Sequence, residues 1–289
     1  SFFMEECKRM RLDVLGPDIN ESDSTFTVND QGAVRFGLLG MRGVGGSAVE
    51  FLLRDRAEKG PYESVFDMAR RVDLRVVNKG TWEALALGGG FDSFQGMHRA
   101  LLFSEEHNDG KNFLEKVRRY GQGFQDQENS TQVSLFGEES GVDIPEPELP
   151  EVPEWNTMEL LKREKEVNGI YLSAHPLDSY RYEIKTFAKN RVSELEDLDA
   201  FVQGSGSRDF AVAGLISNVN LRTTRNGKEM GSFTLEDHEG SREFVLFGQA
   251  FLDFRSFFVN DLMVLVRGRV QRPTWARDDA SARLFADIS

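Results

Sequence analysis

The first hundred residues place their apolar side chains at helical spacing. In ESVFDMARRV at 63–72 and KGTWEALALGGGF at 79–91, apolar residues recur every three or four positions, so both segments predict helices. The glycines at 88–90 end the second of them. A more polar helical pattern continues to about residue 120, and we expect a helical region up to that point.

From residue 208 the apolar positions alternate instead, which is typical of strands. Asn226–Gly227 is a strong hairpin-turn dipeptide, and Glu239–Gly240 predicts a second turn. The expected elements are, in order, strands at 210–224, 230–240 and 242–248, a short helix at 248–258, and strands at 262–272 and 283–289. This order predicts a five-stranded Greek-key barrel of the oligonucleotide-binding (OB) type, and for the whole chain an α+β multidomain fold.

The chain between these regions is polar. Residues 121–154 are rich in Gln, Asn and Ser and then carry PEPELPEVPE, which holds four of the eight prolines. Such a segment cannot bury enough apolar surface to fold alone. A helix is expected next, in EWNTMELLKREKEVNGIYLSAHPL, ending near Gly169 or before His175–Pro176.

The net charge of −13 argues against a nucleic-acid partner only if it is spread evenly, and it is not. Residues 138–161 contain eight acids and no Lys or Arg, whereas residues 35–82 have nine bases and six acids. Residues 208–289 have eleven of each. The acidity is therefore largely a property of the linker, and the flanking domains can present basic faces.

Other features bound the setting. The chain has no run of about 18 apolar residues that would predict a membrane span, and charges interrupt SFFMEECKRMRLDVLG too often for a signal peptide. Its abrupt start leads us to expect a piece of a longer protein. The single cysteine, Cys7, fits a reducing cytoplasm. Four scattered histidines offer no set of zinc ligands.

The glycine-rich stretch GMRGVGGSA at 40–48 precedes an apolar helical pattern, a place where backbone N–H groups commonly bind phosphate. It is not a Walker A loop, because Gly46 stands where the lysine is needed. Gly43-x-Gly45-x-x-Ala48 fits a dinucleotide fingerprint, which makes an NAD-dependent oxidoreductase one alternative. That fingerprint needs a buried strand before it and a parallel strand after it, and ARRVDLRVVNKG is poor in strand signals.

A helix-hairpin-helix accounts better for these glycines. Gly43-Val44-Gly45 would be the turn and Ala48 the small residue that lets two helices pack closely. Backbone N–H groups there would hold a DNA phosphate without reading sequence. The expected duplex-DNA contacts are Arg42, Gly43, Val44, Gly45, Gly46 and Ser47, with Asn78 and Lys79 at a weaker second hairpin. The competing interpretation is a simple turn between packed helices.

A short apolar island, QVSLF at 132–136, interrupts the acidic linker. A buried strand is the usual meaning of such a run, but here Leu135 and Phe136 have no neighbouring core to join. Together with Gln132 they resemble the bacterial sliding-clamp binding motif Q-x-x-L-F. The apolar pair would anchor the peptide in a pocket of its partner and the Gln side chain would hold its polar rim.

The barrel combines basic and aromatic residues, which suits single-stranded nucleic acid. Alternation puts about half of Phe233, Phe244 and Phe247 inside the barrel, and the sequence does not decide which. The expected contacts are Arg222, Arg225, Lys228, Phe233, Arg267, Arg269 and Arg272. An RNA-binding OB module is the other alternative. No nucleophile elbow, zinc helix or kinase motif predicts catalysis.

Taken together, RFGLLGMRGVGGSAVEFLLRDR, NKGTWEALALGGGFDSF, QVSLFG and NGIYLSAHPLDSY resemble the alpha subunit of bacterial DNA polymerase III. The resemblance covers nearly the whole chain. It implies the end of the fingers at 1–34, a tandem helix-hairpin-helix domain at 35–120 and a flexible linker with the clamp-binding motif at 121–154. A helical connector at 155–207 and an OB domain at 208–289 complete the implied domains.

The resemblance also implies function. The partners would be primer–template DNA, single-stranded template, the sliding clamp and other replicase subunits, in the cytoplasm and away from membranes. The magnesium-binding aspartates of the palm are absent from this stretch, so we expect no cofactor here and no polymerisation by the stretch alone. Two departures weaken the expected DNA contacts: Gly80 stands where a basic residue is usual, and the barrel is charge-neutral.

Overall fold

A computed structural model describes residues 6–7, 10–105, 111–133, 144–202, 207–223, 227, 229–271 and 283–285. The chain divides into two compact units. We call Cys7–Ala174 the helical unit, and His175–Ser289 together with Ser1–Glu6 the sheet unit. No helix in the described ranges is both long enough and apolar enough to cross a bilayer.

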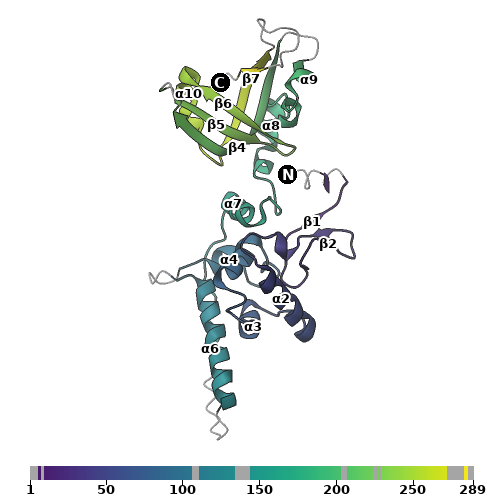
Figure 1. Ribbon diagram of the computed structural model, residues 1–289, viewed down its shortest axis with the longest axis vertical. Helices are drawn as coiled ribbons and strands as arrows, with labels where there is room; N and C mark the ends of the chain where they lie inside the picture. The colour runs from purple at the N-terminus through teal and green to yellow at the C-terminus, as the bar shows by residue number, and fades with distance from the viewer. Residues whose placement is uncertain are drawn as a thin grey trace. The chain divides into compact units, whose positions relative to one another are not determined.

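The helical unit begins with a small sheet and continues with helices (Figure 1). The sheet has the order β1-β3-β2, with two-residue strands β1 (Val14–Leu15), β2 (Thr27–Val28) and β3 (Val34–Arg35). A short 3-10 helix, η1 (Leu38–Gly40), precedes the glycine turn. The helices are α2 (Gly46–Lys59), α3 (Val65–Arg71), α4 (Lys79–Gly88), α5 (Arg99–Leu102), α6 (Phe113–Val133) and α7 (Thr157–Asn168). Their core centres on the fully buried Trp82, Phe91 and Phe113.

Local signals explain where these helices begin and end. The Asn78 side chain accepts a hydrogen bond from the Thr81 N–H and so caps α4, which Gly89 ends in the left-handed conformation with φ 95°. Asn156 caps α7 in the same way, and Gly169 ends it with φ 76°. A glycine at this position avoids the steric cost that other residues meet there. The helices expected at 63–72 and 79–91 are therefore confirmed. Of the two ends expected for the helix after Glu154, the one near Gly169 is confirmed.

The expectation of a flexible linker from residue 121 is wrong for its first part. Helix α6 continues to Val133, and tertiary contacts hold it against α3. A Cβ on Gly121 would lie 2.3 Å from the Ala69 carbonyl oxygen, so only glycine permits this approach. The Gln125 side chain donates to the carbonyl oxygens of Ala69 and Val72, at 3.0 and 2.8 Å. Farther along, Ile144 packs against the core of the helical unit.

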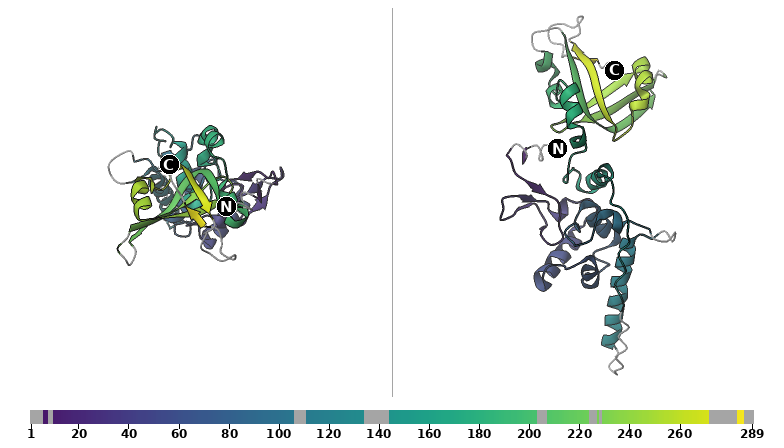
Figure 2. Two further views of the ribbon diagram at one scale, coloured as in Figure 1. Left: turned by 90° about the horizontal axis from the view of Figure 1, so that it is seen from above. Right: turned by 180° about the vertical axis from the view of Figure 1, so that it is seen from behind.

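The sheet unit contains the five-stranded sheet, in the order β6-β5-β4-β7-β8 (Figure 2). Its strands are β4 (Ser207–Thr223), β5 (Glu229–Glu236), β6 (Ser241–Phe247), β7 (Met263–Gln271) and β8 (Arg283–Phe285). Helix α10 (Gly248–Phe254) and η4 (Arg255–Phe257) separate the third and fourth strands, and η2 (Pro176–Tyr180), α8 (Arg181–Phe187), η3 (Val192–Leu195) and α9 (Leu198–Val202) precede the sheet. The strand–helix–strand order expected from the sequence is confirmed.

One long strand organises this sheet. β4 pairs with β7 from Ser207 to Leu215 and with β5 from Leu215 to Thr223, so the two halves of the sheet share it. The register shifts between Ser217 and Asn220, which is where a bulge bends the strand. The apolar core lies on one face of the sheet and includes Phe251 of α10, whose ring a Cβ on Gly231 would meet at 2.5 Å.

Candidate nucleic-acid interface

The glycine turn joins η1 to α2, and the structure gives different reasons for a glycine at each of its positions. Gly43 has φ 90°, in the left-handed region that favours glycine, and its missing Cβ faces Ala84 of α4 at 3.5 Å. Gly45 has an extended backbone, with φ −84°, that any residue adopts. A Cβ on Gly45 or Gly46 would meet no atom within 4 Å. Neither the backbone nor packing within the described chain therefore requires glycine at these two positions.

The N-terminus of α2 is open. Gly45 is its N-cap, no side chain caps it, and its first turn holds no acidic residue. Among the hydrogen bonds of the described residues, none is donated by the N–H of Gly45, Gly46 or Ser47, and all three residues are exposed. The first intrahelical bond is donated by Val49 to Gly45, at 3.1 Å. Free amides and the positive end of the helix macrodipole thus face solvent together.

The prediction that Val44 binds phosphate is corrected by this geometry. Its side chain lies in the core of the helical unit with 8% exposure. Its N–H donates to the Met41 carbonyl at 3.3 Å. Val44 instead anchors the turn, because its buried apolar side chain holds the two flanking glycines close to the core of the helical unit.

Arg42 lies beside the turn and is exposed. Its N–H donates to the Val167 carbonyl at 2.9 Å, and its guanidinium reaches the Glu166 carbonyl at 3.4 Å. The backbone bond holds Arg42 next to the C-terminal end of α7, while the long side-chain contact is weak. A charged group that is held only loosely can turn toward a phosphate at the neighbouring turn.

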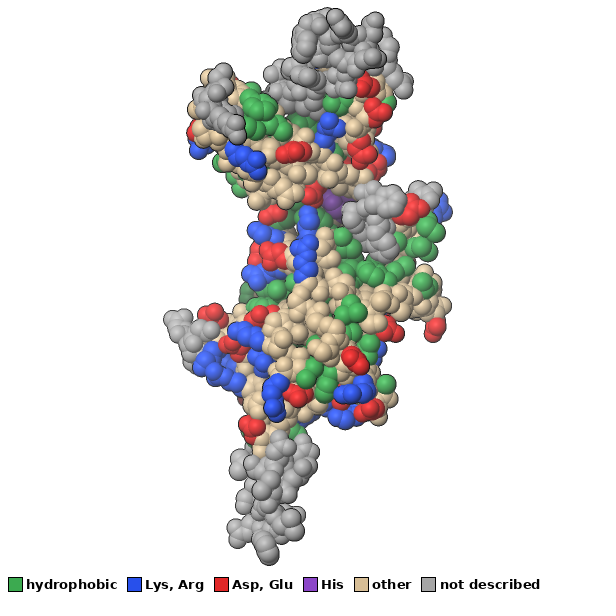
Figure 3. All heavy atoms as spheres, in the orientation of Figure 1, with side chains coloured by type: hydrophobic (Ala, Val, Ile, Leu, Met, Phe, Trp, Pro, Cys, Tyr) green, Lys and Arg blue, Asp and Glu red, His purple; other side chains and the backbone are tan. Residues whose placement is uncertain are grey.

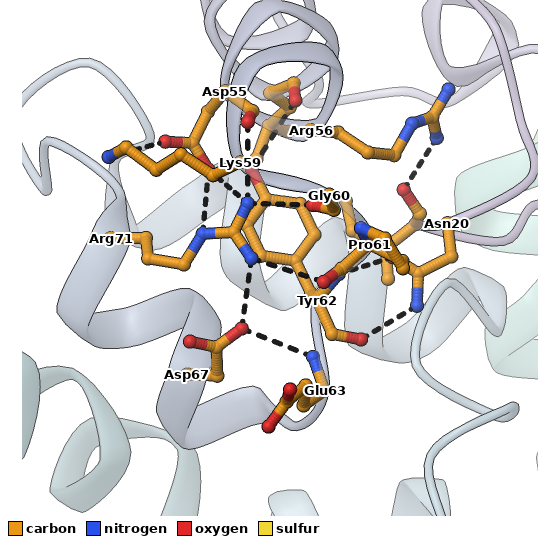
Figure 4. A network of polar contacts seen from close by, with 12 residues as sticks. Asn20, Asp55, Arg56, Lys59, Gly60, Pro61, Tyr62, Glu63, Asp67 and Arg71 are labelled. Carbon is orange, nitrogen blue, oxygen red and sulfur yellow. Dashed lines mark hydrogen bonds and ion pairs between the residues drawn. The ribbon is translucent and has the colours of Figure 1, made fainter.

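A buried network fixes the far end of α2 (Figure 4). Asp55 is 4% exposed and accepts from Arg71 at 3.0 Å, while Lys59 lies 2.9 Å from the same carboxylate. Arg71 also bonds Asp67 at 3.0 Å and stacks over the Tyr62 ring at 4.3 Å. Burial, together with the Asp55 carboxylate, raises the pKa of the Tyr62 hydroxyl. These contacts tie α2 to α3 and thereby set the direction of the open N-terminus.

The second hairpin consists of α3, a loop and α4. The N-terminus of its second helix is capped by a side chain, whereas that of α2 is not. Asn78 uses its side-chain oxygen on its own helix, accepting from the Thr81 N–H at 3.1 Å. Lys79 contacts the Glu115 carboxylate and lies 3.7 Å from that of Glu83. The hydrogen bond between Lys79 and Glu115 raises the pKa of Lys79 and lowers the pKa of Glu115. The two residues expected to bind DNA here already have partners within the chain.

In the sheet unit, the prediction that Phe233 stacks on a base is corrected. Phe233 is 1% exposed and stacks on Phe244 inside the sheet, at 5.5 Å between ring centroids. Phe247 faces outward instead, with 59% exposure. Strand register places Arg222 opposite Met230, and Met230 opposite Phe247, so these three side chains form one row across β4, β5 and β6. This row combines one cation with an exposed ring.

The remaining predicted residues of the barrel fall into two groups. Arg267 and Arg269 are exposed on β7, and Arg269 forms an ion pair with Asp209 at 2.6 Å. Arg225, Lys228 and Arg272 lie outside the described residues. So do Leu135 and Phe136 of the clamp motif, whereas Gln132 lies in the last turn of α6 and its side chain is not described. The structure therefore gives no geometry for the clamp motif.

The elements after α2 contradict the dinucleotide alternative. They are the helices α3 and α4, whereas a dinucleotide fold needs a parallel strand there. Within the described residues, no group of three or more His, Cys, Asp or Glu side chains could hold a metal ion.

Comparison with known proteins gives two family models. One, described as a helix-hairpin-helix motif, matches residues 11–102, and the other, described as an OB-fold nucleic acid binding domain, matches residues 210–283. The first begins earlier than the boundary expected at residue 35. A solved structure of RecG bound to a three-way DNA junction is similar over 61% of this chain and 23% of the solved chain, at 16% sequence identity. Its TM-score of 0.24 does not indicate a shared fold.

Curated relatives cover nearly the whole chain. The DNA polymerase III subunit alpha of Pseudomonas aeruginosa is 35% identical over 97% of the chain, and that of Haemophilus influenzae is 34% identical over 92%. The chain spans 24% and 22% of these two relatives, about a quarter of their length. With a helix-hairpin-helix unit followed by an OB-fold unit, and with similarity along nearly all of its residues, the chain belongs to the DNA polymerase III alpha subunit family.

Proposed function

We propose that this chain is a DNA-binding and clamp-binding region of a replicative DNA polymerase and that it does not itself extend primers. The observation that carries the proposal is the open N-terminus of α2, where Gly45 and Gly46 leave space and unbonded amides. Backbone amides and a helix dipole together favour a phosphate. The relatives' name, which identifies them as DNA polymerase subunits, makes DNA the source of that phosphate.

In this proposal the helical unit holds duplex DNA regardless of sequence, because phosphates carry no sequence information. In the sheet unit, the row that contains Arg222 and Phe247 contacts single-stranded template, with stacking worth roughly 1 to 3 kcal/mol per base. The polymerase is thereby kept near its primer terminus in the bacterial cytoplasm between additions.

Residues 132–136 dock on the sliding clamp in this proposal, and other replicase subunits bind elsewhere on the whole protein. The support is the Q-x-x-L-F pattern. A micromolar peptide contact is worth about 8 kcal/mol, and linkage to a DNA-bound module raises its effect through local concentration. Retention of the chain on immobilised clamp, competed by a QVSLF peptide, tests this part independently of DNA.

The central experiment is to replace Gly45 with Asp and measure affinity for a labelled primer–template by fluorescence anisotropy. An aspartate at this N-cap satisfies the open amides itself and stabilises the fold by a few tenths of a kcal/mol up to about 1 kcal/mol. It also sets a negative charge against the phosphate, and such a juxtaposition costs several kcal/mol. We expect the melting temperature to rise slightly and DNA affinity to fall more than about 10-fold.

Gly45→Ser is the matched control, since serine caps the helix without charge and leaves a hydroxyl that can itself contact phosphate. Its DNA affinity should fall several-fold at most, as expected for an added Cβ alone, and so clearly less than that of the Asp variant. A steep decrease of affinity with salt should accompany binding because counterions are released. Equal affinity of the Asp variant and the unaltered chain would refute the glycine-turn assignment, and preference for an RNA duplex would favour an RNA-binding function.

A further inference from the structure

A cleft lies beside the loop of the second hairpin, against the first turns of α6. Its volume is about 230 Å³, and it is lined by Leu74 and Arg75 of the loop and by Glu115, Arg118, Arg119 and Gln122 of α6. Three guanidinium groups thus border one small space. On the face of the molecule that Figure 3 shows, Lys and Arg side chains gather over the start of α6.

The arginines of this cleft have few direct partners among the described residues. The Nε atom of Arg118 is buried and has no hydrogen-bond partner among the described residues, which is unusual for a buried donor. Arg119 forms no hydrogen bond or ion pair with any residue that the structure describes. The Arg75 side chain is 96% exposed, and its guanidinium lies 3.8 Å from the Asp73 carboxylate. The carboxylate in the wall, Glu115, is bonded to Lys79, and it acts on Arg118 and Arg119 only at longer range.

A neighbouring, larger cleft shows the contrast. It measures about 610 Å³ and shares Leu74, Arg75 and Gln122 with the first. Its other arginines are occupied, because Arg70 binds Glu146 at 2.8 Å and Arg71 binds Asp55 and Asp67. Of these two clefts, only the smaller is lined by guanidinium groups, those of Arg118 and Arg119, that form no hydrogen bond or ion pair with the described residues.

We propose that this cleft binds a backbone phosphate of duplex DNA through Arg75, Arg118 and Arg119, as a second anion site beside the glycine turn. The site rests on the proposed function and extends it to α6. Contacts connect the two positions: Gly43 faces the Gly80 carbonyl at 3.8 Å from its absent Cβ, and the adjacent Lys79 contacts Glu115 in the cleft wall. A guanidinium donates two parallel hydrogen bonds to phosphate, so its geometry suits this role.

The test measures affinity of the full chain for a labelled duplex at several salt concentrations, with Arg118→Gln combined with Arg119→Gln. Affinity should fall roughly 3- to 10-fold, and the slope of log affinity against log salt should become shallower by about 1 to 2, one step for each lost phosphate contact. The loss should be the same on two duplexes of different sequence. Arg75→Gln alone, at a side chain too exposed to affect folding, should reduce the slope by about 1.

A control pair, Arg11→Gln with Arg54→Gln, removes the same charge from positions that do not line the cleft and should leave the slope nearly unchanged. If the unaltered chain shows no salt-dependent duplex binding, the proposed function itself fails, and this site with it. If the unaltered chain binds but the slopes of the cleft variants match those of the control pair, only the second anion site is refuted.

Discussion

The turn before α2 and the turn before α4 both lead into a helix N-terminus, but they leave its amides in different states. At the first turn Gly45 provides no side-chain cap, and the amides of Gly46 and Ser47 face solvent. At the second turn Asn78 caps its own helix, and Lys79 is held by a carboxylate of α6. The first turn therefore offers backbone donors, whereas the second offers its neighbouring arginines.

This difference indicates how two hairpins of one unit can bind the same polyanion by different chemistry. In the proposed function, the open helix end holds one phosphate at close range, and glycine lets the DNA strand approach it. Arginine side chains reach farther and tolerate a looser fit. A closed second turn gains local stability from its cap, while the open first turn depends on the rest of the unit to stay in place.

The largest expected effect concerns that dependence. Arg71→Met removes the cation that joins Asp55 and Asp67 and covers Tyr62. It leaves the buried Asp55 with Lys59 as its one ion-pair partner among the described residues. Removing one partner of a buried ion pair costs about 3 kcal/mol. We expect a loss of about that size in the unfolding free energy of the helical unit, measured by urea denaturation.

A double-mutant cycle separates pairing from packing. Asp55→Ala and Arg71→Met should each destabilise the unit, and the double variant should lose less than the sum because no buried charge remains unpaired. Additive losses would mean that the two side chains act independently, and the first turn would then not depend on this network.

Much of this architecture can be predicted from local sequence. Asn78, Gly89 and Gly169 mark helix ends because capping and left-handed turns are determined by a few neighbouring residues. The strand–helix–strand order of the sheet unit is set by alternation and turn dipeptides for the same reason. The glycine turn was predictable as a turn before a helix, whereas its use as a phosphate site stays a prediction.

The failures share a tertiary cause. Helix α6 extends past residue 120 because Gly121 and Gln125 meet the backbone of α3, a contact that no local pattern reveals. Phe233 and Phe247 lie in similar alternating patterns, and only strand pairing decides which lies inside. Arg118 and Arg119 resemble any solvated helix face until the loop carrying Arg75 is brought beside them.

The next effect in size separates the glycines of the first turn. Gly43→Ala forces a Cβ into the left-handed region and should lower stability by about 1 to 2 kcal/mol. Gly46→Ala enters open space at the first helical position and should raise stability by up to about 1 kcal/mol, while weakening DNA binding several-fold because the methyl group holds the phosphate away. Thermal unfolding and duplex anisotropy measure the two effects. Parallel changes in stability and affinity at both positions would contradict distinct roles.

The smallest expected effect tests whether the second turn is held closed by its acidic neighbour. Glu115→Gln removes the carboxylate that binds Lys79 and borders the arginine cleft, so duplex affinity should rise about 2- to 3-fold and the salt slope should steepen by about 1. The hydrogen bond with Lys79 lowers the pKa of Glu115, so the pair is intact above the usual pKa of glutamate and is lost only as pH falls through the lowered value. Measurements near neutral pH therefore compare a closed turn with an opened one.

Glu58→Gln, the same charge change at an exposed position near the far end of α2, should leave both duplex affinity and the salt slope unchanged. An equal gain in both variants would reduce the effect to net charge and remove Lys79 from the DNA-binding surface.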